Sequence, residues 1–360
     1  MSHDAPPAGA AALPGQTARA AGDPAGDGPA AALPPTRFER LFDAFTTVTA
    51  GRHQAAVVRI GFGLAWLGYL LREWPERRVL YGDRSPWSPE LADTLLSATH
   101  AFTVLTWSDG RLWFETVYHL AIAAAVLMVL GWRTRASAVL FAVTVLSLQN
   151  RNVLVGDGGD NVVHLMALYL LLVRCGRVWS LDARRRARRP AAGPTGEVRA
   201  VADALATMLH NCGMLIIAVQ VVLIYSTAGW YKVQGSRWQD GTALHYPLHL
   251  DYFTPWPGLS ALLGSSLLLT FALSYGTVIL QVGFPFTLLN RRLKNVLLAL
   301  MIAEHAGIAV LLGLPFFSLA MIAADAVFLP TAFLLQVGAL RPDTLRGMLP
   351  RRPAGEPGNT

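Results

Sequence analysis

Lysine and cysteine are both scarce in this chain. Only two of its 30 basic residues are lysines, Lys232 and Lys294. The two cysteines, Cys175 and Cys212, lie in apolar stretches and lack the spacing of a metal site. We therefore interpret both cysteines as small buried side chains, and we predict neither a disulfide nor a bound metal.

Charge is also low, and the short motifs of several soluble enzymes are missing. Only 15% of the residues are charged, and there is no phosphate-binding loop, Gly-x-Ser-x-Gly turn or His-Glu-x-x-His helix. Apolar residues make up 53% of the chain, and the mean hydropathy is +0.40. This composition predicts an all-α, polytopic membrane protein. The basic residues cluster at the ends of apolar stretches, so we predict the lipid bilayer as partner and no nucleic acid.

Composition divides the chain into three parts. Residues 1–36 are rich in Ala, Gly and Pro and almost free of bulky apolar side chains, which predicts a disordered tail. This tail lacks the charged start and apolar core of a secretory signal, so we expect the first span to stay uncleaved. Residues 37–340 form the predicted transmembrane domain, and residues 341–360 form a basic cytoplasmic tail.

Apolar stretches of about 20 residues predict membrane-spanning helices. Residues 37–50 alternate charged and aromatic side chains at helical spacing, which predicts a helix lying on the membrane surface. Residues 259–272 are apolar but short, and we expect a half-helix or re-entrant element there. The eight predicted spans are residues 54–72, 113–131, 135–151, 161–176, 206–226, 274–290, 295–313 and 317–338.

Basic clusters indicate how the predicted spans are oriented. Groups of arginines, joined by Lys294 in one case, follow predicted spans two, four, six and eight. All four groups face the cytoplasm if both chain termini are cytoplasmic, which satisfies the positive-inside rule. The loop 73–112 opposes this arrangement, because it carries Arg77 and Arg84 but must lie outside. We accept this conflict and predict a multi-pass protein of the cell membrane with both termini cytoplasmic.

Lys232 follows a long apolar stretch in a chain that otherwise uses arginine. Arginine is in effect never deprotonated, whereas a partly buried lysine can lose its proton and act as a base. The alternative is a helix-end anchor whose amine reaches the membrane surface. The predicted topology places Lys232 on the outer face, in the same segment as Trp238 and Asp240.

Two carboxylates stand in a glycine-rich turn directly before a predicted span, at Asp157 and Asp160. One interpretation is a helix N-cap, because an aspartate there accepts backbone N–H groups and favours the positive helix end. The other is that one carboxylate pairs with Lys232 or holds a polar ligand, as ionisable groups near the bilayer often do.

Histidines raise two further possibilities. Glu304 and His305 are adjacent inside a predicted span, and consecutive residues do not share a helix face. At least one of them therefore points toward another helix or a cavity. His245 and His249 have the i, i+4 spacing of a metal pair, but Pro247 between them argues against the helix that would align them.

Four segments together resemble one known family, and they run through most of residues 40–338. They are Gly158-Gly159-Asp160, the Trp-Ser-x-Asp stretch from Cys175 to Asp182, the Ala-Gly-x-x-Lys stretch from Ala228 to Ala243, and the stretch from Glu304 to Ala323. The chain resembles bacterial membrane proteins with the horizontally transferred transmembrane (HTTM) domain. That domain is related to the membrane part of vitamin K-dependent gamma-carboxylase.

The resemblance implies roles for particular residues. In the carboxylase, the lysine of Ala-Gly-x-x-Lys is the base linked to oxidation of reduced vitamin K, and Lys232 occupies that place. His305 matches the histidine that opens the later His…Gly…Phe segment. A further functional histidine of the carboxylase has no match, since the nearest one here is His164. Position 281 is Gln where the family leads us to expect an acid.

The first functional hypothesis is a redox or peptide-modifying membrane enzyme, similar to a gamma-carboxylase or epoxidase. Lys232 would take a proton from a lipid-soluble quinol, the resemblance implying a reduced quinone such as vitamin K. The other two predicted catalytic residues are Asp160 and His305. Asp160, or alternatively Asp240, would hold and tune the lysine, and His305 would stabilise the developing anion. The predicted substrate-binding residues are Trp238, Asp240, Asp157 and Glu304.

The second hypothesis is a non-catalytic accessory protein for the maturation, export or immunity of a small peptide. Sporulation-delaying toxin systems include a relative of this domain with a role in toxin maturation. The carboxylase continues into a large luminal domain, whereas little sequence follows the last predicted span here. We therefore expect full gamma-carboxylation to need a separate extracytoplasmic protein. A transporter is a weaker alternative, because ionisable residues gather at one face and no inverted repeat is visible.

Overall fold

The computed structural model describes residues 36–188 and 196–339, and these residues are helical with no β-strand among them. This confirms the predicted all-α fold class. The predicted tails lie outside the described residues, apart from Thr36. The chain divides into two compact units, residues 1–41 and 42–360.

The predicted surface helix is present as α1 (Arg37–Thr47). It begins with a reciprocal cap, in which the Thr36 hydroxyl accepts the backbone N–H of Glu39 at 3.2 Å. The Glu39 carboxylate in turn accepts the backbone N–H of Thr36 at 2.6 Å. Such a cap satisfies backbone donors that the first helical turn leaves free.

Five described helices are long and apolar enough to cross a membrane. A sixth crossing would combine two shorter helical segments. The first is α14 (Pro315–Asp325) continued by η5 (Ala326–Phe328), and the second is α15 (Thr331–Ala339). The two segments are bent by 112° relative to each other. Pro330 lies at this bend, where it cannot continue the hydrogen bonding of a helix. The five helices are α2 (Arg52–Glu73), α5 (Arg111–Leu130), α9 (Glu197–Gln234), α12 (Leu267–Thr287) and α13 (Arg291–Leu311).

Two of the eight predicted spans correspond to helices that do not meet these criteria. Residues 135–151 form α6 (Thr134–Arg151), whose ends are polar, and residues 161–176 contain α7 (Gly158–Leu170), which has only 13 residues. Both pack against neighbouring helices, since α6 contacts α5 and α7, and α7 also contacts α14. Such contacts bury much of their surface, so these helices need less apolar surface of their own than a lipid-facing span.

The predicted boundary near residue 273 is wrong. The short helix α11 (Pro257–Gly264) ends earlier, and α12 already begins at Leu267. Ser266 caps α12 by accepting the backbone N–H of Leu269 at 3.3 Å. A serine inside an apolar stretch therefore marks the break that hydropathy alone did not show.

Short elements fill the connections between the long helices. Between α2 and α5 lie α3 (Arg77–Leu80), α4 (Pro89–Thr99) and η1 (Leu105–Trp107), and α8 (Leu181–Ala187) follows α7. The segment from α9 to α11 holds α10 (Ser236–Gln239), η2 (Ala243–His245), η3 (Pro247–His249) and η4 (Asp251–Phe253).

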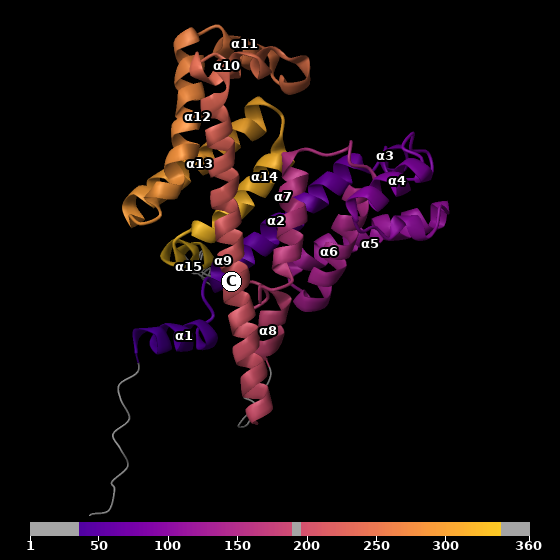
Figure 1. Ribbon diagram of the computed structural model, residues 1–360, viewed down its shortest axis with the longest axis vertical. Helices are drawn as coiled ribbons and strands as arrows, with labels where there is room; N and C mark the ends of the chain where they lie inside the picture. The colour runs from indigo at the N-terminus through magenta and orange to yellow at the C-terminus, as the bar shows by residue number, and fades with distance from the viewer. Residues whose placement is uncertain (1–35, 189–195, 340–360) are drawn as a thin grey trace, which may run out of the picture. The chain divides into compact units, whose positions relative to one another are not determined.

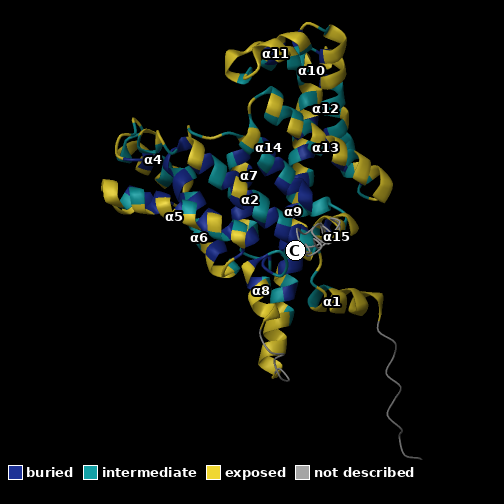
Figure 2. Ribbon diagram, turned by 180° about the vertical axis from the view of Figure 1, so that it is seen from behind, coloured by how far each residue is buried: buried dark blue, intermediate teal, exposed yellow. Residues whose placement is uncertain are grey.

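The helices of the second unit form two groups that α14 joins. The first group is α2, α5, α6 and α7, and the second is α9, α12 and α13 (Figure 1). Helix α14 contacts α2 and α7 on one side and α13 on the other. Buried residues gather where these helices meet, whereas α8 and α11 are largely exposed (Figure 2).

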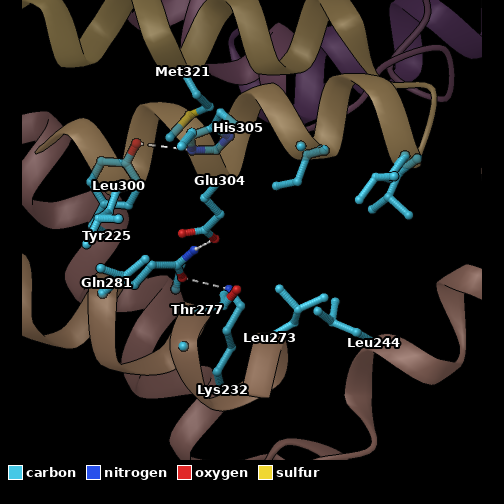
Figure 3. Close-up of a pocket in the computed structure, with 18 of the residues that line it drawn as sticks. Tyr225, Lys232, Leu244, Leu273, Thr277, Gln281, Leu300, Glu304, His305 and Met321 are labelled. Atoms are coloured by element: carbon cyan, nitrogen blue, oxygen red, sulfur yellow. Dashed lines mark hydrogen bonds between the residues drawn. The ribbon is translucent and has the colours of Figure 1, made fainter. Parts of the chain in front are cut away.

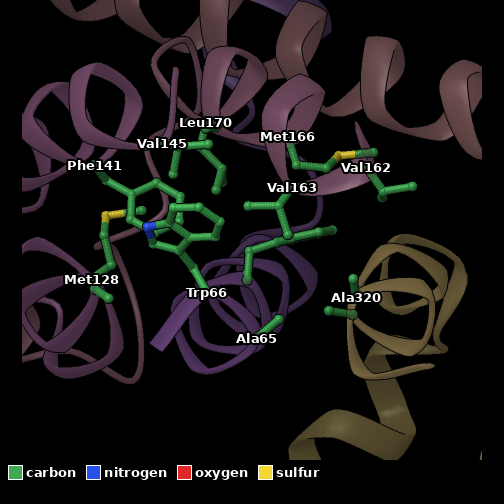
Figure 4. Packing of buried hydrophobic residues seen from close by; sticks show 14 of the residues in the cluster. Ala65, Trp66, Met128, Phe141, Val145, Val162, Val163, Met166, Leu170 and Ala320 are labelled. Carbon is green, nitrogen blue, oxygen red and sulfur yellow. The ribbon is translucent and has the colours of Figure 1, made fainter. Parts of the chain in front are cut away.

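Trp66 lies at the centre of the first group and is almost fully buried (Figure 4). Its ring packs among side chains from three other helices. Within lipid, such close packing, and not removal from water, holds helices together. The labelled neighbours of Trp66 include Met128, Phe141, Val163 and Met166.

Arg59 links α2 to the end of α5 and to the connection between α7 and α8. Its fully buried guanidinium donates hydrogen bonds to four backbone carbonyls. These belong to Met128, to Val129 at 2.9 Å, to Cys175 at 3.2 Å and to Trp179 at 2.7 Å. Met128 and Val129 lie in the last turn of α5, where a helix leaves carbonyls without partners, whereas Cys175 and Trp179 lie in the connection between α7 and α8.

The Trp-Ser-x-Asp segment completes the same connection. Ser180 caps α8 by accepting the backbone N–H of Ala183 at 2.9 Å. Asp182 accepts the backbone N–H of Arg133 at 3.0 Å and that of Thr134 at 2.8 Å, at the start of α6. This segment therefore has a structural role, because it fixes the turn between α5 and α6 against the start of α8.

Candidate functional site

A cavity of about 620 Å³ lies between α9, α12, α13 and α14, and the α10–η3 segment covers one end (Figure 3). Its size and mainly apolar wall suit a small lipid-soluble molecule. The described apolar residues that line it include Ile224, Ala228, Leu244, Leu248, Leu273, Leu280, Leu300, Ile308, Leu311, Phe317 and Met321.

Three polar side chains form a continuous hydrogen-bonded chain in this cavity. The Lys232 Nζ donates to Gln281 Oε1 at 2.8 Å, and Gln281 Nε2 donates to Glu304 Oε1 at 2.9 Å (Figure 3). The other carboxylate oxygen of Glu304 is buried and has no partner among the described residues. An amine on α9 is thus linked through an amide on α12 to a carboxylate on α13. We name these three residues the polar chain.

Close contact between α9 and α12 positions Lys232. A Cβ atom added to Gly229 would lie 2.8 Å from Val282 Cγ2 and 3.0 Å from the Val282 backbone nitrogen. Only glycine permits this approach without displacing α12. Lys232 follows three residues later on the same helix face, so the approach brings its side chain to Gln281. The spacing of the Ala-Gly-x-x-Lys segment thereby has a geometric explanation.

Trp238 holds Lys232 from another direction. Helix α9 ends at Gln234, and α10 carries Trp238 so that its ring centroid lies 5.2 Å from Lys232 Nζ. A cation over an aromatic face is attracted to the negative potential of the ring. The half-buried Trp238 also lines the cavity.

A second buried group borders the polar chain. Tyr225 donates its hydroxyl hydrogen to Asp325 Oδ2 at 3.0 Å, and its oxygen lies 3.1 Å from His305 Nε2. A hydroxyl has one hydrogen, so His305 Nε2 must then carry the proton and donate to Tyr225. His305 Nδ1 is left as an acceptor, and it has no partner among the described residues.

The sequence patterns did not single out Tyr225 or Asp325. Tyr225 lines the cavity, and Asp325 lies behind it on α14 with none of its surface exposed. Asp325 could have been recognised as a single carboxylate inside an apolar stretch, because such residues are rare in membranes and face the protein interior.

The family model of the HTTM domain matches residues 50–333. This chain belongs to the HTTM family. The uncharacterized protein YitO of Bacillus subtilis (strain 168) is 28% identical over 208 residues, which cover 56% of this chain and 62% of YitO. The sporulation-delaying protein SdpB of the same organism is 28% identical over 133 residues, which cover 37% of this chain and 38% of SdpB. This HTTM protein thus matches less than two thirds of either relative's length, and no solved structure matches it.

Position 281 shows how this HTTM protein departs from the expected pattern. Gln281 stands where we expected an acid, and its amide both accepts from Lys232 and donates to Glu304. The carboxylate in the cavity therefore comes from α13 and not from α12. An uncharged bridge keeps the amine and the carboxylate apart.

The two aspartates of the glycine-rich turn are used in capping α7. Asp157 accepts the backbone N–H of Gly159 at 2.6 Å and the hydroxyl of Tyr69 at 2.8 Å. Asp160 Oδ2 accepts the backbone N–H of Asp157 at 2.8 Å. The turn borders the cavity through Gly158, but the cavity-lining residues do not include either aspartate.

Asp240 lies on the surface of the α10–η2 turn. It accepts hydrogen bonds from the Thr242 hydroxyl and backbone N–H, which lower the pKa of Asp240 below its ordinary value. Arg237 lies 3.6 Å away as its ion-pair partner. Among the described residues, Lys232 forms no ion pair with Asp160 or Asp240, and its hydrogen bond is to Gln281.

Three further histidines are His164, His245 and His249. His245 and His249 stack with ring centroids 4.0 Å apart, in 3-10 turns. His164 lies 3.0 Å from Gln149 on the neighbouring helix α6. Within residues 36–188 and 196–339, no three His, Cys, Asp or Glu side chains are grouped as metal ligands.

Proposed function

We propose that this HTTM-domain membrane protein binds a lipid-soluble quinol in its cavity and that Lys232 takes a proton from the quinol hydroxyl. The polar chain is the observation that carries the proposal. It presents an amine, an amide and a carboxylate in a cavity whose wall is otherwise mainly apolar. An aromatic quinol with an apolar tail has the matching polarity.

The neighbours of Lys232 fit the role of a base. In the proposed step the neutral amine accepts the proton, so an ammonium ion forms beside a quinolate anion. The Trp238 ring and the Glu304 carboxylate both favour that positive charge, and Gln281 keeps accepting an N–H bond throughout. The side chain is held by fixed partners, so little reorganisation accompanies the proton transfer.

His305 takes a role different from the one expected from sequence. With Nε2 donating to Tyr225, the free Nδ1 is an acceptor. It therefore suits a second quinol hydroxyl better than a developing anion. Asp325 acts through Tyr225 by fixing this tautomer, and is a positioning residue.

The test follows ionisation of a bound naphthoquinol of the vitamin K type, kept reduced under anaerobic conditions. The quinolate has its own ultraviolet absorption, so its fraction can be measured as pH is raised. We expect ionisation at lower pH when bound than when free, by about 1 unit or more for a base worth at least about tenfold. Lys232→Met should bind the quinol and lose this shift, whereas Lys294→Met should keep it.

The Lys232→Arg variant tests whether Lys232 itself takes up the proton. Lys232→Arg preserves the positive charge but cannot act as a base. A fixed guanidinium also favours the quinolate by its charge, so the proton balance separates the two cases. If quinolate formation in the unchanged protein released one proton to the solvent, as it must in the arginine variant, proton uptake by Lys232 would be excluded. Absence of quinol binding in the unchanged protein would reject the substrate class as well. Mass spectrometry of co-purified small molecules, from this protein and from Lys232→Ala, provides an independent check.

The second candidate function is an accessory role for a small secreted peptide. It is favoured by similarity to SdpB, which is described as a sporulation-delaying protein. Lys232 would then be a structural residue, held by Gln281 and Trp238. Co-expression with a candidate small secreted peptide tests the proposal. We expect deletion of the HTTM protein to abolish peptide maturation or export, and Lys232→Met to leave both intact.

A further inference from the structure

A second cavity, of about 840 Å³, lies beside α8, at the opposite end of the bundle from α10 and α11 (Figure 1). Its described lining contains two arginines, Arg177 and Arg184, and no acidic residue. We name it the basic groove. Its other lining residues are His53, Val129, Leu130, Val178, Trp179, Ser180, Leu181, Ala183, Ala187, Val337 and Gly338.

The two arginines of the groove have no hydrogen-bond or ion-pair partner for their side chains in the described part of the chain. Neighbouring arginines do have partners, since Arg174 pairs with Asp203 at 2.8 Å and Arg185 with Asp182 at 2.8 Å. Burial, and then the nearby Arg174 guanidinium, lower the pKa of Arg177. Asp203 also attracts Arg177, but its ion pair is with Arg174 and the described groove lining has no acid of its own, so an anion would be attracted to the groove.

Apart from His53 and Ser180, the other side chains of the groove are apolar, and Trp179 is held in a fixed position. Trp179 has a φ of 48°, a backbone conformation that a tryptophan rarely adopts, and its carbonyl is fixed by Arg59. Its ring contacts His53 edge-on at 5.6 Å between centroids. Tryptophan is favoured at the membrane–water interface, where one side is apolar and the other is wet.

We propose that the basic groove binds the phosphate headgroup of an anionic phospholipid. Guanidinium groups pair with phosphate oxygens through two parallel hydrogen bonds, which suits Arg177 and Arg184. The apolar wall with Leu130 and Leu181 accepts the start of an acyl chain. Basic pockets at the ends of membrane helices recognise lipid headgroups by this combination of charge and apolar contact. The proposal is independent of the chemistry at Lys232.

Native mass spectrometry of the full chain in detergent tests this site. The probes are phosphatidylglycerol, zwitterionic phosphatidylcholine of equal chain length, and inorganic phosphate. We expect one phosphatidylglycerol to bind in preference to phosphatidylcholine. The double variant Arg177→Gln/Arg184→Gln should weaken phosphatidylglycerol binding roughly 30-fold, at about 1 kcal/mol for each arginine near a lipid surface.

A matched control removes the same charge elsewhere. Arg291→Gln/Arg292→Gln acts at the exposed start of α13, outside the groove, and should weaken binding less than about twofold. Equal losses in both double variants would show general attraction to charge and would overturn the proposal. Unchanged binding in the groove variant would overturn it too. Binding of inorganic phosphate that displaces the lipid would identify a soluble anion as the ligand, against the proposal.

A single variant guards against loss of folding. Arg184 is exposed and caps no helix with its side chain, so Arg184→Gln should keep the thermal unfolding temperature. It should still weaken phosphatidylglycerol binding about fivefold, the share of one arginine. A folded Arg184→Gln protein with unchanged lipid binding would contradict the groove as a headgroup site.

Discussion

At the scale of single residues, Gln281 decides how the cavity is arranged. Its amide group offers one acceptor and two donors, and it uses them to connect Lys232 with Glu304. Hydropathy and spacing gave no reason to link positions 232, 281 and 304, which lie on three different helices. The resemblance marked position 281 only as unusual. The structure shows that the unusual residue is the bridge.

Removing the Gln281 bridge should lower the stability of the protein. Gln281→Leu leaves a buried amine and a buried carboxylate without their partner, and we expect unfolding to be easier by about 1–3 kcal/mol. Chemical or thermal unfolding in detergent measures the change. Gln239→Leu, at an exposed position on α10, should change stability by less than about 0.5 kcal/mol. Equal stability of the Gln281→Leu protein would show that the polar chain contributes nothing.

Tyr225 makes a second prediction at this scale. Tyr225→Phe deletes the hydroxyl that satisfies both Asp325 and His305, so about 1–3 kcal/mol of stability should be lost. Tyr231→Phe, on the exposed side of the same helix, is the control and should have little effect. A Tyr225→Phe protein as stable as the control variant would contradict the hydrogen bonds from which the tautomer of His305 is inferred.

At the scale of helices, small residues decide which helices approach closely. Gly229 brings α9 against α12, and Ser266 starts α12 within an apolar stretch. The sequence predicted most helices correctly, because apolar stretches and basic ends are local signals. It misplaced the start of α12, since a capping serine differs little in hydropathy from its surroundings.

The contact at Gly229 can be tested directly. Gly229→Ala forces α9 away from α12, and overpacking of this kind costs about 1–3 kcal/mol. Quinol ionisation by the variant should weaken as well, because Lys232 moves away from Gln281. Gly258→Ala, in α11 and outside the cavity lining, is a suitable control, since its Cβ atom would meet no heavy atom within 4 Å. Similar stability of both variants would argue against close helix contact as the cause of the Lys232 position.

At the scale of the whole second unit, the bundle places two cavities at its opposite ends. The cavity with the polar chain lies toward the α10–η3 segment, and the basic groove lies beside α8. The arginine clusters predict that the α8 end faces the cytoplasm. This arrangement would let one end contact anionic headgroups while the other takes up a substrate at the outer face.

Cysteine labelling tests that orientation. In a chain with Cys175 and Cys212 replaced by serine, Tyr252→Cys should react with a membrane-impermeant maleimide on intact cells. Arg188→Cys should react only after the membrane is permeabilised. Both positions are exposed, so accessibility within the protein is comparable. The reverse labelling pattern would invert the predicted topology.

The sequence by itself determined that this is a helical HTTM-family membrane protein, and it singled out Lys232 beside Trp238. Tertiary structure decided the rest. It brought Glu304 and His305 into the cavity with Lys232, used Asp157 and Asp160 as helix caps, and left Asp240 on the surface. The physical reason is that hydropathy is a property of one helix, whereas these hydrogen bonds form between side chains of different helices. Those bonds depend on close packing at small residues, which apolar patterns do not specify.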